Sequence, residues 1–354
     1  MKRFGIYAVA ALLSSVCGSA TAYDFIVDSV FYNITSDTDL TVEVTYEKSG
    51  YNSYSGDITV PEQVSYDGTS YNVTAIGNHA FRACTALTSV AVGEGVTSVG
   101  DYAFAESTAL TSVSLPTTVE SLGKRVFTKC EALTSVSLPD AITSMGTYVF
   151  YQATALTELT MPAGMTEVPQ CTALDCTALQ SISLHDNITT LGIGCFRNCS
   201  SLTSVTIPES VTVIKTFVFN GCSALNEVNV LAVNPPTVAG TNAFTTYSSA
   251  TLYVPEGYAE TYEAHTIWSA FSMIEEKDFS ETTGISNVSA NNGKAFSIVD
   301  GGISMNTDGS TVKIYDITGK MIYSGISTGG ETITVPANGV YIIRTDNQTT
   351  KVAF

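Results

Sequence analysis

The stretch Leu110–Ala132 reads LTSVSLPTTVESLGKRVFTKCEA, and Leu133–Ala155 repeats its pattern as LTSVSLPDAITSMGTYVFYQATA. Every step between the leucines that begin equivalent stretches is 23 residues. Those leucines are Leu87, Leu110, Leu133, Leu156, Leu179, Leu202 and Leu225. A constant step of this length indicates a solenoid in which each unit is one turn that buries its apolar side chains against its neighbours.

Within the unit, numbered 1 to 23 from the leucine, apolar residues at positions 4 and 6 alternate with hydroxyl residues, which predicts a strand. Proline at position 7 ends it, and apolar residues at positions 10 and 13 predict a second, opposing segment. Glycine at position 14 is expected to turn the chain. Position 18 holds a phenylalanine, whose burial should contribute about 1.5–3 kcal/mol per turn. The spine residues are Phe81, Phe104, Phe127, Phe150, Phe196 and Phe219.

The repeat that begins at Leu156 departs from this pattern. Pro169 replaces the glycine, and Ala173 replaces the phenylalanine. We expect Leu174 or Leu179 to fill part of the gap in the spine, and the solenoid to be irregular there.

The unit resembles the BspA-like leucine-rich repeats of bacterial surface proteins, whose pattern is L-x-x-I-x-I-P-x-x-V-x-x-I-G-x-x-A-F-x-x-C. The match covers roughly residues 58–278. The resemblance implies a mainly β leucine-rich-repeat right-handed solenoid with N- and C-terminal caps. It also implies a non-enzymatic, exported binding or adhesion protein.

The chain is therefore expected to have several parts. Residues 23–86 form an N-terminal cap hairpin and a first atypical repeat, residues 87–224 form six 23-residue repeats, and residues 225–278 form the C-terminal capping repeat. Caps are needed because an uncovered last turn exposes its apolar face and an unpaired strand edge. Residues 279–284 are a linker.

Residues 285–354 lose the 23-residue step and show short alternating segments between turn residues, which predicts a small antiparallel β-sandwich. The expected strands are Ala295–Ile298, Val312–Tyr315, Met321–Tyr323, Thr332–Val335 and Val340–Arg344. The motifs in Val312–Lys320 and Val335–Arg344 resemble the sorting domain of type IX secretion in Bacteroidetes. That resemblance implies a domain that addresses the protein to the cell exterior; a spacer of similar sequence is the alternative.

Residues 1–22 read as a secretory signal peptide, with Lys2 and Arg3 before an apolar run and a small-residue cleavage site at Ala20–Ala22. Cys17 also allows a lipoprotein as the alternative, although Val16 is larger than the small residue expected just before a lipidated cysteine. No segment has the roughly 20 apolar residues of a membrane helix. An exported protein at the outer cell surface or in the medium is expected.

Charge excludes some partners. The chain of 354 residues has 33 acidic and 15 basic side chains, a formal net charge of −18. An acidic surface repels phosphate, so nucleic acids and anionic membranes are disfavoured. Hydrophobic residues are 44% of the chain, enough for a substantial core. We expect a monomer.

Seven cysteines remain after Cys17 is removed, and five of them share position 21. Ser107 and Ala153 hold the same position in other turns. This exchange indicates that the position needs a small buried side chain, not a disulfide bond. The five are Cys84, Cys130, Cys176, Cys199 and Cys222. Oxidation between the last three, on successive turns, is the alternative.

No catalytic or metal site is predicted. The three histidines, His79, His185 and His265, lie on turns too far apart to meet. His185 replaces a strand-ending proline and is expected to be a solvated side chain. No cysteine pair has the spacing of a zinc site. We therefore expect no enzyme and no cofactor.

The candidate binding surface is the face formed by positions 3 and 5, whose side chains point away from the core. It is rich in hydroxyl groups, and it is a platform for a protein or glycan on a host or other cell. Its predicted contact residues are Ser112, Ser114, Ser135, Ser137, Glu158, Thr160, Ser181, Ser183 and Glu227. A merely solubilising surface is the alternative interpretation.

Aromatic side chains of the caps are rival contact sites, although most are expected to be packing. They are Tyr51, Tyr54, Tyr66, Tyr71, Tyr247, Tyr258 and Trp268. A surface glycan-binding module is the alternative function, and the lack of rings on the platform argues against it.

Overall fold

The computed structural model describes residues 22–48 and 50–279, and then 296–299, 302–305, 311–316, 321–326, 328, 332–334, 340–345 and 348–353. The chain divides into two compact units between Glu275 and Glu276, and each is described by itself. The predicted signal sequence, apart from Ala22, lies outside the described residues, as does most of the predicted linker.

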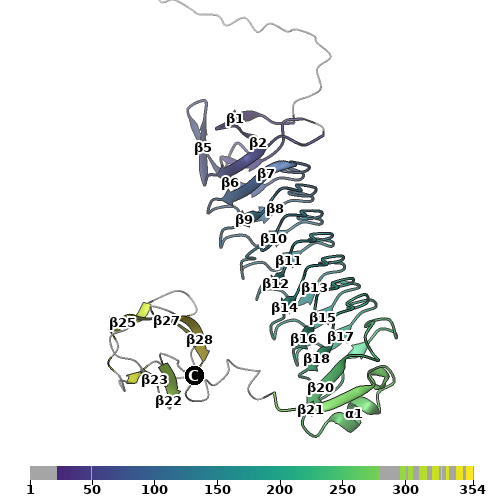
Figure 1. The fold of residues 1–354 in the computed structure, drawn as a ribbon. Helices are drawn as coiled ribbons and strands as arrows, with labels where there is room; N and C mark the ends of the chain where they lie inside the picture. The colour runs from purple at the N-terminus through teal and green to yellow at the C-terminus, as the bar shows by residue number, and fades with distance from the viewer. Residues whose placement is uncertain are drawn as a thin grey trace, which may run out of the picture. The chain divides into compact units, whose positions relative to one another are not determined.

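The first unit is a solenoid of stacked turns, and the strands of successive turns pair in parallel to form two β-faces (Figure 1). We call the face built from positions 3 to 6 the hydroxyl face. Its strands are β4 (Ser55–Val60), β7 (Ala86–Val92), β9 (Ser112–Ser114), β12 (Glu158–Thr160), β14 (Ser181–Ser183), β16 (Ser204–Ile207) and β18 (Glu227–Val230). Val205 lies opposite Val228, so neighbouring turns are in register as the repeat predicts.

The second face is built from positions 12 and 13 and their equivalents in the first turn. Its strands are β6 (Thr69–Ile76), β8 (Ser98–Val99), β10 (Ser121–Leu122), β11 (Ser144–Met145), β13 (Glu167–Val168), β15 (Thr190–Leu191), β17 (Val213–Ile214) and β19 (Thr237–Val238). The register advances by 23 residues from Thr190 to Val213, and by 24 from Val213 to Thr237 at the start of the C-terminal cap.

The phenylalanine spine is buried as predicted. All six spine rings have 0% exposure. Phe104 and Phe127 stack with their centroids 5.3 Å apart, as do Phe127 and Phe150. Phe219 stacks on Phe244 of the C-terminal cap, and Tyr54 of the N-terminal cap covers Phe81. The stack follows the solenoid because the same residue type recurs at each turn.

The irregular repeat interrupts both faces, as predicted. On the hydroxyl face, β9 continues only through an isolated bridge from Ser114 to Ser137, and β12 pairs with β14 alone. On the second face, one sheet ends at β11 and another begins at β13. Ala173 is buried and divides the phenylalanine stack into two parts.

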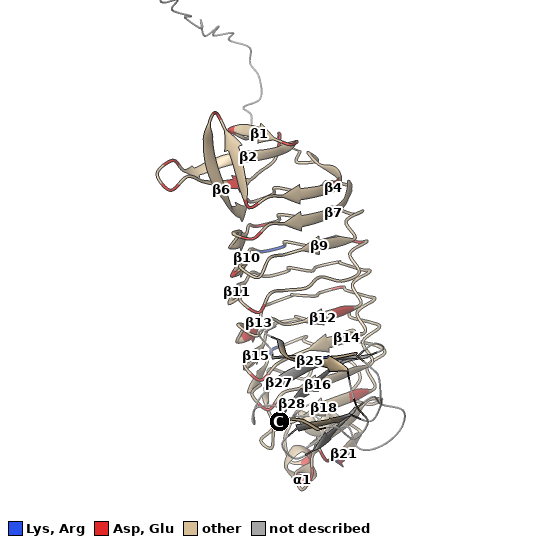
Figure 2. Cartoon of the chain, turned by 90° about the vertical axis from the view of Figure 1, so that its left-hand side faces the viewer, with Lys and Arg blue, Asp and Glu red and all other residues tan. Residues whose placement is uncertain are grey.

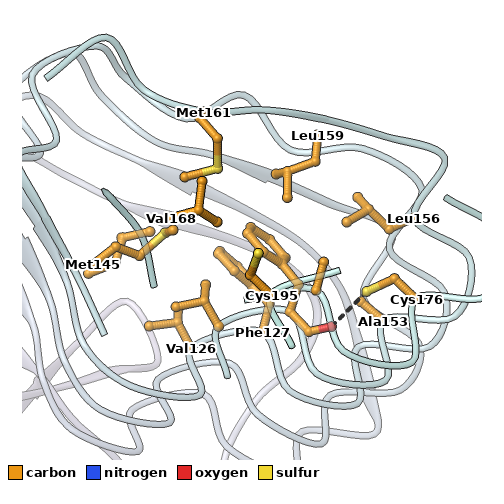
Figure 3. Packing of buried hydrophobic residues seen from close by; sticks show 14 of the residues in the cluster. Val126, Phe127, Met145, Ala153, Leu156, Leu159, Met161, Val168, Cys176 and Cys195 are labelled. Carbon is orange, nitrogen blue, oxygen red and sulfur yellow. Dashed lines mark hydrogen bonds between the residues drawn. The ribbon is translucent and has the colours of Figure 1, made fainter. Parts of the chain in front are cut away.

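The filling of that gap was predicted only in part. Leu179 is buried at the first position of its own turn, whereas Leu174 is half-exposed. Sulfur-containing side chains, among them Met145, Met161 and Cys195, are buried in this part of the core (Figure 3). Methionine suits such a place because its flexible side chain fills irregular gaps.

The chain turns directly after the position-14 glycines, as predicted, and the backbone N–H of Ala103 donates to the Gly100 carbonyl oxygen (3.3 Å). The structure adds that glycine is favoured there because neighbouring turns approach closely. The backbone of these glycines is not in the left-handed region. A Cβ on Gly123 would lie 2.6 Å from the amide nitrogen of Asp101, and one on Gly192 would lie 2.9 Å from the carbonyl carbon of Pro169.

In the turn where Pro169 stands at position 14, β13 no longer pairs with β11. A side chain alone does not explain this, because Lys215 holds position 14 in a turn whose β17 pairs with β15. Proline has no backbone N–H, so Pro169 cannot make the hydrogen bond to the preceding turn that Gly192 and Lys215 make at 2.8 and 3.0 Å.

The seven cysteines of the described chain are free thiols, in agreement with the predicted ladder. The structure adds a reason for the exchange of cysteine and serine at position 21. Cys130 Sγ donates a hydrogen bond to the Phe104 carbonyl oxygen (3.1 Å), and Ser107 Oγ donates to that of Phe81 (2.6 Å). The bond of Cys176 is drawn in Figure 3. Burial raises the pKa of the Cys176 thiol to about 12, so it remains protonated at neutral pH.

The N-terminal cap is larger than a hairpin. Three antiparallel strands, β1 (Phe25–Val27), β2 (Val30–Ser36) and β3 (Thr41–Val44), extend the second face, and β3 pairs with β6 in parallel. β5 (Gln63–Tyr66) pairs with β6 to form the insertion that enlarges the first turn. The cap therefore covers the strand edge that the first turn would otherwise expose.

The C-terminal cap closes the other end. β20 (Thr251–Pro255) pairs with β18 in parallel, and β21 (Met273–Lys277) forms the edge of that sheet. The short helix α1 (Ala259–Glu263) and the 3₁₀ helix η1 (Trp268–Ala270) lie between them. Trp268 is fully buried, and its Nε1 donates to the Pro236 carbonyl oxygen (2.9 Å).

The second unit has two antiparallel sheets, which bears out the predicted small β-structure after the solenoid. The strands are β22 (Phe296–Val299), β23 (Gly302–Met305), β24 (Thr311–Asp316), β25 (Met321–Ile326), β26 (Thr332–Thr334), β27 (Val340–Thr345) and β28 (Gln348–Ala353). β23 and β28 were not predicted. Both sheets contribute buried side chains, for example Ile303 and Ile343.

Candidate functional site

The hydroxyl face presents the predicted contact residues outward. Figure 2 looks at the solenoid with β4, β7, β9 and β12 one below another on this face. Eight of the nine side chains are exposed; Glu227 is half-buried, and its carboxylate accepts a hydrogen bond from Asn229 Nδ2 (2.8 Å). Asn229, at position 5 of the same turn, is buried rather than outward-facing.

Four of the predicted residues line one hollow. A cavity of about 370 Å³ is bordered by Ser135, Val136, Ser137, Leu138, Glu158 and Thr160. It lies at the break in the sheet, where β12 has no strand beside it on the side of the preceding turn. The remaining five predicted residues lie along the face on other turns.

The hollow has an apolar floor. Val136 is half-buried, whereas Val113 and Leu159 at the same position of the neighbouring turns are 5% and 2% exposed. Leu138 is half-buried, as is Leu115 at its position in the preceding turn.

Sequence reasoning assigned positions 4 and 6 to the core and therefore missed Val136 and Leu138. No local signal could have found them, because residues 110–116 and 133–139 are both LTSVSLP. The neighbouring turns differ: β9 pairs with β7, whereas residues 133–139 have only the isolated Ser114–Ser137 bridge.

Hydroxyl groups on this face can hold a carboxylate. Thr88 Oγ1 and Ser89 Oγ donate hydrogen bonds to Asp57 Oδ1, at 2.7 and 2.6 Å. These two hydrogen bonds hold the pKa of the Asp57 carboxyl below its usual value, and the bond from Ser89 has the larger effect. Hydrogen bonds to the charged form favour it. The serines and threonine of the hollow offer the same donor type.

A second hollow lies at the same junction on the second face. Its volume is about 400 Å³, and Met145, Met165, Glu167 and Pro169 are among the residues that line it. The irregular repeat thus opens the surface on both faces.

The histidines do not form a catalytic group. His185 is half-buried rather than solvated, which corrects the expectation. Its Nε2 bonds the Pro162 carbonyl oxygen (2.6 Å), and its Nδ1 accepts from the backbone N–H of Asn187 (3.2 Å). Both ring nitrogens therefore serve the local fold. Within the described residues, no three or more His, Cys, Asp or Glu side chains are placed to hold a metal ion.

Most cap aromatics are packing, as expected. Tyr54, Tyr71 and Trp268 are less than 9% exposed. Tyr66 is 43% exposed, but its ring stacks on Phe25 with centroids 4.3 Å apart. Tyr258 remains exposed.

Sequence reasoning missed a row of rings at position 16, along the edge of the turns. His79, Tyr102, Arg125 and Tyr148 hold this position in four successive turns. His79 and Tyr102 stack with centroids 5.1 Å apart, and Arg125 lies 4.5 Å from the ring centre of Tyr148. The signal was in the sequence, as a column read across the repeats.

None of the helices in the part of the chain that the structure describes is long and apolar enough to cross a membrane.

Two known bacterial structures are similar to this chain. A leucine-rich repeat protein from Bacteroides ovatus ATCC 8483 is 24% identical, with a TM-score of 0.57 over 72% of each chain. A leucine rich cell surface protein from Faecalibacterium prausnitzii A2-165 is 19% identical, with a TM-score of 0.46 over 75% of this chain and 98% of that one. The first of these likenesses supports the fold.

A comparison with curated proteins finds no match. The family model described as "BspA type Leucine rich repeat region" matches residues 62–176 and 173–265, more than half of the chain. With its 23-residue turns and buried phenylalanine spine, this chain belongs to the BspA-type leucine-rich-repeat family.

Proposed function

We propose that this chain is an exported surface protein that binds a protein partner through the hydroxyl face, centred on the hollow between residues 135–138 and β12. The observation that carries the proposal is the hollow itself, where half-buried Val136 and Leu138 lie below exposed Ser137 and Glu158. An apolar centre within a polar rim is the arrangement of protein–protein interfaces.

The face around the hollow suits an extended contact. Stacked repeats carry exposed residues such as Ser112, Thr160 and Ser183 on successive turns, and a partner can therefore touch several turns at once. Their hydroxyls can donate to backbone carbonyls or carboxylates of the partner, as Ser89 does to Asp57. Leucine-rich-repeat folds are typically non-enzymatic binding scaffolds, and we infer a role in adhesion to host or neighbouring cells.

Filling the hollow should weaken this binding. Ser137→Trp places a bulky uncharged side chain between Val136 and Glu158. We expect the dissociation constant to rise at least tenfold. The measurement is binding of the purified protein to an array of extracellular-matrix proteins, followed by titration of each hit. Ser144→Trp, at an exposed position of β11 on the second face, is the matched control and should bind as the unchanged protein does. No hit on the array, or equal affinity for Ser137→Trp, would contradict the proposal.

We further propose that residues 1–22 and 285–354 direct export. The support is the charged and apolar N-terminal run and the resemblance of Val312–Lys320 to type IX sorting domains. Expression in a bacterium with that secretion system should give extracellular protein that begins at Tyr23, as mass spectrometry can measure. Deleting residues 285–354 should leave the solenoid inside the cell envelope. Secretion of the shortened chain at the normal level would rule out the sorting role.

A further inference from the structure

The row at position 16 continues from the N-terminal cap across the first turns. Tyr51 stacks on His79 with centroids 4.8 Å apart, and His79 stacks on Tyr102. The Arg125 guanidinium follows, 5.9 Å from the ring centre of Tyr102 and 4.5 Å from that of Tyr148. All five side chains are half-buried, so each keeps part of its surface in contact with solvent.

The backbone at this position disfavours large side chains. His79, Tyr102, Arg125 and Tyr148 all have φ between 57° and 61°, the left-handed region that costs a non-glycine residue roughly 1–2 kcal/mol. Gly194 holds the same position in a later turn without that cost. Cys171 and Phe217 also hold this position, with φ of 55° and 63°, so the left-handed backbone belongs to every turn. Since cysteine and glycine fill the position in later turns, the fold does not require rings and a guanidinium there.

Among the described residues, Arg125 is a cation with no carboxylate in an ion pair with it. Besides Tyr102 and Tyr148, the Tyr151 ring centre lies 5.8 Å from its guanidinium carbon. None of the ion pairs in the described parts of the chain includes Arg125. Arg82 is its counterpart, since it also lies over Tyr51 and Tyr102, but Arg82 pairs with Glu106 at 3.2 Å.

The local charge is opposite to that of the whole chain. Lys124, Arg125 and Lys129 fall within six residues, although residues 23–284 contain only eight basic side chains against 28 acidic ones. Lys124 pairs with Asp101 at 3.2 Å, and Arg125 keeps its charge for a ligand. In Figure 2 a blue segment stands beside β10 on a chain whose other coloured segments are mostly red.

We propose that Arg125 and the rings beside it bind an acidic polysaccharide, a sugar chain with carboxylates, that lies along this edge of the solenoid. Arginine N–H groups match a carboxylate in pairs, and the ring stack holds the guanidinium in place. The phenol groups of Tyr102 and Tyr148 lie on either side and can hydrogen-bond sugar hydroxyls. This ligand and surface are distinct from those proposed for the hydroxyl face.

A peptide fits this edge less well. Peptides often add to a free strand edge through their main chain. Here the backbone N–H groups of Tyr102, Phe104 and Glu106 already donate to carbonyl oxygens of the next turn, at 2.9, 2.9 and 2.7 Å. Recognition must come from side chains, as it does for sugars.

The test is a titration of the full chain with oligogalacturonate by calorimetry at low salt. We expect binding that weakens as salt rises, because the charges are exposed. Arg125→Gln should weaken it at least tenfold. Arg197→Gln is the matched control, because Arg197 also lies over a ring, Phe217, at 5.1 Å, and it should leave the affinity unchanged. Circular dichroism should show every variant folded.

Three outcomes would overturn the proposal. They are no binding of oligogalacturonate, equal affinity of Arg125→Gln and the unchanged protein, and binding of polyglutamate as tight as that of oligogalacturonate. Neutral dextran should not bind. Ser137→Trp should bind oligogalacturonate normally, so failure at the hollow and failure at this edge can be told apart.

Discussion

Replacing Phe127 with alanine should lower the free energy of unfolding by about 3–5 kcal/mol. The ring has no exposed surface and stacks between Phe104 and Phe150, with both centroid distances 5.3 Å. Its removal leaves a void that the turns cannot close, because their register is fixed by hydrogen bonds on both sides. Denaturant titration followed by circular dichroism measures the loss.

Phe217→Ala is the matched control for this prediction. Phe217 lies at position 16, is half-buried, and contacts the Arg197 guanidinium at 5.1 Å. The same change should cost about 1 kcal/mol or less there, since it removes mainly one cation–π contact. Equal losses for Phe127→Ala and Phe217→Ala would mean that the spine does not dominate the core.

The sequence alone predicted the parts of the fold that repeat. A 23-residue step, a buried ring at position 18 and a small side chain at position 21 are each tested in every turn, so chance agreement is small. It also located the irregular repeat from Pro169 and Ala173, because two core positions fail together there.

What could not be predicted depends on contacts between turns. Residues 110–116 and 133–139 have one sequence, but only the first contains a regular strand, β9. β9 pairs with β7 on the preceding turn, whereas residues 133–139 are joined to β9 only by the Ser114–Ser137 bridge and have no paired strand on the turn that contains Pro169. The hollow at Val136 is therefore a property of neighbouring turns that the heptapeptide does not contain.

The row at position 16 was missed for a different reason. Strand spacing draws attention to positions that alternate, whereas Tyr102 and Arg125 lie in a left-handed backbone conformation outside the strands. Reading that column across turns would have found the rings. Their stacking, however, requires the register that the structure supplies.

Gly123→Ala should destabilise the solenoid by about 1–3 kcal/mol or more. The added Cβ would stand 2.6 Å from the Asp101 backbone nitrogen and 2.7 Å from the Gly100 carbonyl carbon, both on the preceding turn. Backbone atoms cannot move aside without separating β8 from β10. Asp101 would move too, and its Oδ1 accepts the Lys124 backbone N–H at 2.8 Å. Thermal and denaturant unfolding of the purified variant measure the cost.

Gly257→Ala separates this effect from ordinary glycine chemistry. Gly257 has φ +81°, and a Cβ added there would have no atom within 4 Å, so alanine meets only backbone strain of about 1 kcal/mol. The φ of Gly123 lies outside the left-handed region, so alanine there meets no backbone strain. Any loss of stability in Gly123→Ala must therefore come from contact with the preceding turn. If Gly123→Ala were as stable as the unchanged chain, neighbouring turns would have room to shift, and close approach of the turns would not be the reason for glycine at position 14.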